Sequence, residues 1–159
     1  MSLTNNDVLR RFRYALNLND ANLAGAFALA GQPMETAGIA RLLKHEEDPD
    51  FLECTDPLLA AFLDGFIIQR RGPRQDAPAH AGPPSGRLNN NDILKKIRIA
   101  LQLREEDLVA IMQQAGVSVS GTEFSALFRQ KNHAKYKLCG DQFLRNFLTG
   151  LEIWRPKTS

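Results

Sequence analysis

The sequence predicts an all-α protein built from two homologous four-helix repeats that pack as a pseudo-symmetric helical bundle. Two observations carry this prediction. Apolar residues recur with the 3.6-residue period of amphipathic helices rather than with the alternation of strands. The second half of the chain also repeats the first at a constant shift, with no gap from Leu3/Leu88 to Gly72/Lys157.

The duplication is plainest where each copy begins, with "LTNNDVLRRFRYALNL" at 3–18 and "LNNNDILKKIRIALQL" at 88–103. It predicts a first repeat at 3–72 and a second at 88–157. Between them lies "PRQDAPAHAGPPSGR", residues 73–87, whose prolines and glycines exclude regular helix and predict a flexible linker.

The first helix of each copy has a clear apolar stripe. We expect the Asn-Asn-Asp triplets at 5–7 and 90–92 to precede and cap it, because their side-chain oxygens can accept hydrogen bonds from free helix amides. The stripe consists of Val8, Leu9, Phe12, Ala15 and Leu16, matched by Ile93, Leu94, Ile97, Ala100 and Leu101.

The second and third helices are predicted from their ends. The second covers 21–30 and 105–115, and each copy closes with a glycine, Gly31 or Gly116, suited to a left-handed cap. The third covers 35–44 and 121–129, and in the second copy Ser120 and Glu123 have the spacing of a capping box.

The fourth helix is the most apolar and starts at a strong signal, with Asp56 as N-cap and Pro57 in the first turn. Asp141 repeats the cap. Gly65 and Gly150 fall inside the helix, where glycine costs about 1 kcal/mol relative to alanine, so we expect another helix to cross closely there. Its own symmetry mate is one candidate, because the two apolar fourth helices are expected to pack together.

The motifs N-N-D-[VI]-L-x-x-x-R-x-A-L and C-x-D-x-x-L-x-x-F-L-x-G each occur twice. In these motifs the chain resembles the YehS-like family, small cytoplasmic bacterial proteins made of two copies of a domain of unknown function. The resemblance covers the whole chain except the linker. It implies fold and kinship, and it offers no catalytic residue to transfer.

Several function classes find no support in the sequence. The histidines, His45, His80 and His133, do not occupy equivalent positions in the two copies, and no nucleophile with a base is apparent, so we expect no enzyme. Cys54 and Cys139 have no metal-ligand spacing and are expected to be buried thiols. The acidic run at 45–50 lacks the spaced ligands of a calcium loop. No metal, cofactor or small-molecule ligand is expected.

No apolar run reaches the length of a membrane span and no secretory signal is evident, so a cytoplasmic protein without membrane contact is expected. Charge divides the copies. Residues 3–72 hold seven Lys/Arg and ten Asp/Glu, whereas residues 88–157 hold eleven and seven. This asymmetry favours an interaction module that binds a protein partner or a second copy. The alternative is nucleic-acid binding through the basic second repeat and a helix-turn-helix-like segment at 111–129.

Candidate interaction residues are cations that both copies keep or that the second copy gathers. Arginine at positions 13 and 98 lies off the apolar stripe and suits a carboxylate or phosphate partner, although a salt bridge within the repeat, to Asp56 or Asp141, also explains it. The full set of candidates is Arg13, Arg98, Arg129, Lys131, Lys135 and Lys137.

Overall fold

The computed structural model describes residues 3–72 and 88–154, which contain α-helices and no strand. The first repeat consists of α1 (Asn5–Leu16), α2 (Asp20–Leu29), α3 (Thr36–Leu42) and α4 (Asp56–Arg71). The second consists of α5 (Asn90–Leu101), α6 (Glu105–Gln114), α7 (Gly121–Leu127) and α8 (Asp141–Ile153). The predicted all-α fold of two four-helix repeats is confirmed. The predicted linker, 73–87, lies outside the described residues, as do residues 155–157.

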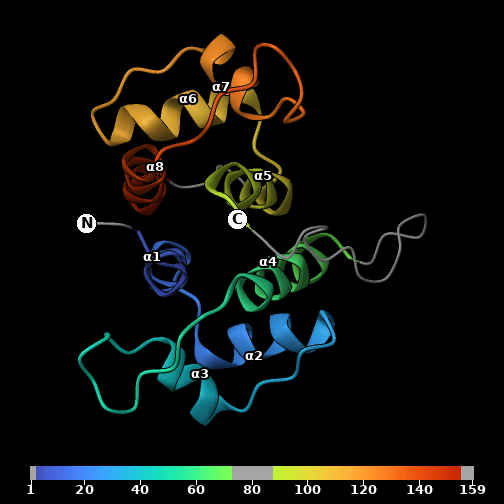
Figure 1. Cartoon of the computed structure of the whole chain (residues 1–159), viewed down its shortest axis with the longest axis vertical. Helices are drawn as coiled ribbons and strands as arrows, with labels where there is room; N and C mark the ends of the chain where they lie inside the picture. Colours follow the sequence, from blue (N-terminus) through green and yellow to red (C-terminus); the bar gives the residue numbers. More distant parts are fainter. Residues whose placement is uncertain (1–2, 73–87, 155–159) are drawn as a thin grey trace.

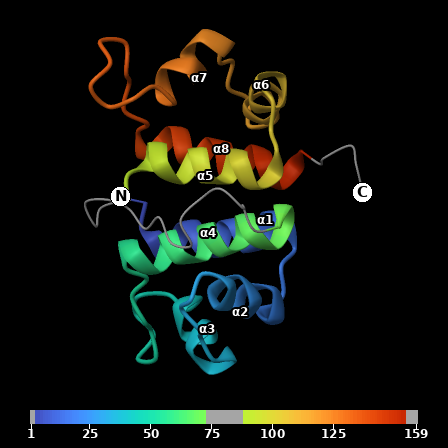
Figure 2. The ribbon, with the colours of Figure 1, turned by 90° about the vertical axis from the view of Figure 1, so that its right-hand side faces the viewer.

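The first and last helices of both repeats form the centre of the molecule. Figure 2 shows α1, α4, α5 and α8 lying side by side, with α2 and α3 on one side and α6 and α7 on the other. Within the centre, α4 packs against α5 and α1 packs against α8, so each fourth helix contacts the first helix of the other repeat. The expected pairing of the two fourth helices is therefore wrong.

The four central helices run in the same direction. The backbone N–H of Leu3, just before α1, donates to Asp141 at the start of α8, and further along Arg11 donates to Thr149. The second pair repeats this register, because Leu88 donates to Asp56 and Lys96 pairs with Asp64. Asn5 at the start of α1 also donates to Asp56 at the start of α4, so all four helices begin on the same side of the molecule.

A continuous apolar core includes residues of both repeats. In the first repeat, Phe12 meets Phe66 edge to face with ring centroids 5.2 Å apart, and Phe62 with centroids 6.1 Å apart. Because α1 and α4 each have a second face turned toward the other repeat, neither repeat closes its core alone.

Gly65 and Gly150 are crossed closely by another helix, as predicted. A Cβ at Gly65 would lie 1.6 Å from the carbonyl oxygen of Ala26, and one at Gly150 would lie 1.9 Å from that of Ile111. The crossing helices are thus α2 and α6 of the same repeat. The suggestion that the fourth helix of the other repeat crosses at these glycines is wrong.

The capping predictions hold at the glycines and at Asp7 and Asp92, which close capping boxes in the first turn, but the asparagines of the triplets are not the caps. Gly31 and Gly116 have φ of 78° and 79°, and the capping box of Ser120 and Glu123 is present. However, α1 and α5 already begin at the first asparagine of each triplet and are capped by Thr4 and Asn89.

The N-caps of the fourth helices lie one residue before the predicted positions. Thr55 and Gly140 are the N-caps of α4 and α8, so Asp56 and Asp141 lie inside the first turn. A carboxylate in the first turn still interacts favourably with the positive end of the helix dipole. Aspartate therefore marks the start of each fourth helix, although it is not the N-cap residue itself. The third helices end two residues earlier than predicted, at Leu42 and Leu127.

Candidate interaction site

The end of the molecule where α1, α4, α5 and α8 begin is its most polar buried region. We call this end, with the chain segments 43–55 and 128–140 that lead into α4 and α8, the N-terminal pole. Four helix starts bring unpaired backbone N–H groups and the positive ends of four helix dipoles together. Acceptor side chains are therefore stabilising at this end.

Asp56 and Asp141 supply two of these acceptors and connect the repeats. One oxygen of Asp56 accepts from Asn5 Nδ2 at 2.7 Å, and the other accepts from the backbone N–H of Leu88 at 3.1 Å. Asp141 accepts likewise from Asn90 Nδ2 at 2.8 Å and from the N–H of Leu3 at 3.0 Å. Each carboxylate thus links the fourth helix of its own repeat to a residue that precedes the first helix of the other repeat.

Asp141→Asn is expected to change how the free energy of unfolding depends on pH. The side-chain hydrogen bond from Asn90, with the backbone N–H of Leu3 and the charge of Arg145, lowers the pKa of Asp141 below its ordinary value of 3.8. The folded protein keeps this group ionised at a pH where the unfolded chain binds a proton. Its contribution to stability is therefore full above about pH 4 and is lost as pH falls through the lowered pKa.

Urea unfolding at about pH 7 and about pH 3 tests this expectation. The gap in unfolding free energy between wild type and Asp141→Asn should narrow at the lower pH. The exposed Asp50 provides the control variant Asp50→Asn. A gap of the same size at both pH values would contradict the assigned role of Asp141.

Two buried asparagines hold the loops of the pole. Asn6 is 3% exposed and donates to the carbonyls of Leu42 and Leu52, both at 2.9 Å, while its Oδ1 accepts from the N–H of Cys54 at 2.9 Å. These hydrogen bonds are buried or partly buried, so Asn6 supplies the partners that such backbone groups need away from water. The side chain therefore ties the end of α3 to the segment before α4.

The second repeat reproduces this arrangement. Asn91 is 5% exposed and donates to the carbonyls of Leu127 and Lys137, and it accepts from the N–H of Cys139 at 2.9 Å. Sequence reasoning missed this role because it treated the triplets as caps. The signal was present, since both asparagines lie three residues before a stripe leucine and so on the buried face.

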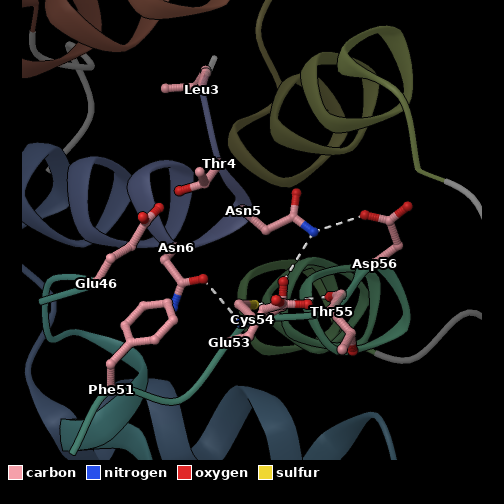
Figure 3. A pocket seen from close by; sticks show the side chains of 10 residues that line it. All are labelled: Leu3, Thr4, Asn5, Asn6, Glu46, Phe51, Glu53, Cys54, Thr55 and Asp56. Carbon is pink, nitrogen blue, oxygen red and sulfur yellow. Dashed lines mark hydrogen bonds between the residues drawn. The ribbon is translucent and has the colours of Figure 1, made fainter. Parts of the chain in front are cut away.

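A cavity of about 780 Å³ opens beside these groups in the first repeat (Figure 3). Three carboxylates, of Glu46, Glu53 and Asp56, surround it. No hydrogen bond or ion pair joins the exposed Glu46 and Glu53 side chains to the described residues. The lining is Leu3, Thr4, Asn5, Asn6, Glu46, Phe51, Glu53, Cys54, Thr55 and Asp56. We call this feature the acidic cavity.

A smaller cavity in the second repeat shares three repeat-equivalent lining positions with the acidic cavity, at Asn91, Lys131 and Tyr136. Its volume is about 150 Å³, and its lining also includes Lys95 and Arg129. By the repeat register, Lys131 stands where the first repeat has Glu46, and Lys135 stands where it has Asp50. The two repeats consequently present opposite charges on one backbone frame.

Four of the predicted interaction residues meet here. Arg129, Lys131, Lys135 and Lys137 are all exposed on the segment 129–137, which we call the basic loop. His133 organises the loop, because its ring nitrogens contact Arg129 Nη1 at 3.3 Å and accept from the N–H of Lys135 at 3.0 Å. The basic loop has no acidic residue.

Arg13 and Arg98 do not join this group on the loop. In the first repeat, Arg13 Nη2 lies 3.9 Å from Asp20 Oδ1. Arg98 donates to the carbonyl of Leu103 at 3.1 Å and lies over the ring of Phe128, 4.9 Å from its centroid. A salt bridge within the repeat is therefore present for Arg13, but its partner is Asp20 rather than the suggested Asp56, and Arg98 contacts Leu103 and Phe128 rather than Asp141.

The thiols offer no nucleophile. Burial, with the nearby Asp56, raises the pKa of Cys54 to about 12, and burial with Asp141 does the same for Cys139. Both thiols are protonated and buried, as predicted. Among residues 3–72 and 88–154, no three potential metal ligands cluster. None of the helices in these ranges is long and apolar enough to span a bilayer.

The helix-turn-helix-like segment corresponds to α6 and α7. The second of these would be the reading helix, yet it has seven residues and buries Phe124 and Leu127. Its exposed side includes Glu123, and Ser125 donates to the carboxylate of Glu105 at 3.3 Å. The helix α7 carries Glu123 and no lysine or arginine, so it offers no cation to a phosphate backbone.

Comparison with known proteins places this architecture in a family. The chain is 40% identical over 149 residues to the uncharacterised protein YehS of Escherichia coli (strain K12), and the match covers 94% of each chain. No solved structure matches the chain. The family described as protein of unknown function (DUF1456) matches twice, at residues 5–72 and 90–155. The chain therefore belongs to the DUF1456 family, with one copy of the family's domain in each four-helix repeat.

Proposed function

We propose that the protein is a non-enzymatic, cytoplasmic interaction module that binds a protein partner at its N-terminal pole. The main support is that the two repeats share the same buried hydrogen bonds at the pole but differ in the charge of their exposed loops. Asn6 and Asn91 make the same three hydrogen bonds, yet the loops that they hold have opposite charges.

The buried frame accounts for folding, whereas the exposed charges do not. Exposed ion pairs contribute about 0–1 kcal/mol each. Within the described residues, no carboxylate pairs with the side chains of Lys131 or Lys135. Loops held by a rigid frame commonly form binding surfaces, and a cluster of one charge attracts a partner of the other. The basic loop thus suits an acidic protein surface.

Nucleic acid is the second candidate, and the basic loop favours it as well, because Tyr136 lies among the cations. Because α7 has no lysine or arginine, the loop rather than a reading helix would be the contact surface. Such binding would weaken steeply as salt concentration rises.

Affinity purification from the source bacterium, with and without nuclease, tests the proposal. Three baits are compared: the wild type, Lys131→Gln/Lys135→Gln, and the matched control Arg71→Gln/Arg104→Gln, which removes the same charge from exposed sites away from the loop. We expect a protein that survives nuclease, is retained by the control and is lost from the loop variant.

Two other results of the purification would change this conclusion. Partners lost on nuclease treatment would favour nucleic-acid binding. Equal capture by all three baits, or no specific capture by any, would overturn the proposed binding surface.

A further inference from the structure

We infer that a second copy of this chain is a partner of the N-terminal pole: the basic loop of one copy docks in the acidic cavity of the next. This inference rests on the proposed binding function and identifies the partner as a second copy of the chain. Two surfaces on the same chain support it, and neither is satisfied within one molecule.

The acidic cavity has the size and charge to receive a short basic segment. Its volume of about 780 Å³ is in the range of ligand-sized clefts. Glu46 and Glu53 stand at its rim, exposed and without a described cation partner. The half-buried ring of Phe51 adds an apolar surface to the lining.

The basic loop offers the complementary features. Its lysines are exposed, and directly after it Leu138 is 68% exposed, the largest exposure among the exposed large apolar side chains of the described residues. Leu138 thus gives the end of the loop an exposed apolar side chain beside its cations. Docking would place the cations near Glu46 and Glu53 and bring Leu138 toward Phe51.

The two surfaces cannot meet within one molecule. Both segments belong to the N-terminal pole, but they lie on opposite sides of it, because the two repeats lie at opposite ends of the molecule's long axis (Figure 1). Reciprocal docking of two copies would give a closed twofold dimer, whereas one contact per pair of copies would give a ring or an open chain. In either case the association buries charges of opposite sign against each other and should weaken as salt concentration rises.

Sedimentation velocity of the full chain provides the test. At low salt, the average mass should rise over the range of about 1 to 100 μM, and in about 0.5 M salt, where the Debye length is only a few ångströms, it should return to that of the monomer. A wild type that is monomeric under all conditions would overturn the inference. If such a protein still captures a nuclease-resistant partner through the loop, the proposed function survives without self-association.

Two neutralised variants make the test specific. Glu46→Gln/Glu53→Gln removes the cavity's charge, and Lys131→Gln/Lys135→Gln removes the loop's. Each alone should be monomeric. A 1:1 mixture should form dimers that do not grow, because one complete pair of surfaces remains. That mixture also shows that both variants are folded.

Arg71→Gln/Arg104→Gln serves as the control and should assemble like the wild type. Assembly of either neutralised variant to the wild-type extent would overturn the inference, as would a mixture that stays monomeric.

Discussion

Gly65→Ala is expected to lower the free energy of unfolding by roughly 2–4 kcal/mol, since inserted volume in a packed core is costly. The added methyl carbon would lie 1.6 Å from the carbonyl oxygen of Ala26, and 2.5 Å from its carbonyl carbon. Both atoms belong to the α2 backbone, which cannot move aside without moving the whole helix. The gain in helix propensity, about 1 kcal/mol, does not offset this clash.

Urea or thermal unfolding measures the effect, and Gly38→Ala is the matched control. Gly38 is also a helical glycine, but the nearest atom to an added Cβ is the flexible end of Met34, at 3.2 Å. The control should be neutral or stabilise by up to about 1 kcal/mol. Gly150→Ala should behave like Gly65→Ala. Equal stability of the Gly65 and Gly38 variants would contradict the close α2–α4 crossing.

Asn6→Ala is expected to cost roughly 3–5 kcal/mol, because it leaves three backbone groups without partners and each buried unsatisfied group costs about 1–3 kcal/mol. The groups are the carbonyls of Leu42 and Leu52 and the N–H of Cys54. They hold the end of α3 and the chain entering α4, so this loop should also lose protection from hydrogen exchange.

Asn6→Asp separates hydrogen bonding from volume. Aspartate has almost the same shape, but its carboxylate would face the two carbonyls that now accept from Nδ2, so it should be at least as destabilising as alanine. Asn132→Ala, at an exposed loop asparagine, is the control and should stay within about 0.5 kcal/mol of wild type. A tolerated Asn6→Asp would refute the hydrogen-bonded frame.

Features set by local chemistry were predictable from the sequence. The apolar period located the helices, and the shifted repeat showed two copies of one fold. Gly31 and Gly116 marked left-handed helix ends because their φ values of 78° and 79° suit glycine. Of the candidate site, the basic loop was predictable, since charge on an exposed segment can be counted without knowing its neighbours.

Features that depend on distant partners were not predictable in this way. The amide of Asn6 bonds residues 36 and 46 positions away, and Asp56 bonds an amide 32 positions away. In the sequence, both residue types precede an apolar run and so have the appearance of helix caps. The acidic cavity likewise requires Thr4 and Glu46 to approach each other.

By itself, then, the sequence determined that the protein is all-α, that its architecture is doubled, and that its copies differ in charge. The tertiary structure alone decided that the four central helices run in one direction, that α4 packs on α5 and α8 on α1, and that Gly65 meets α2. The physical reason is that periodicity fixes which face of a helix is buried. It is chain connectivity and the close fit of backbones that fix which helix covers that face.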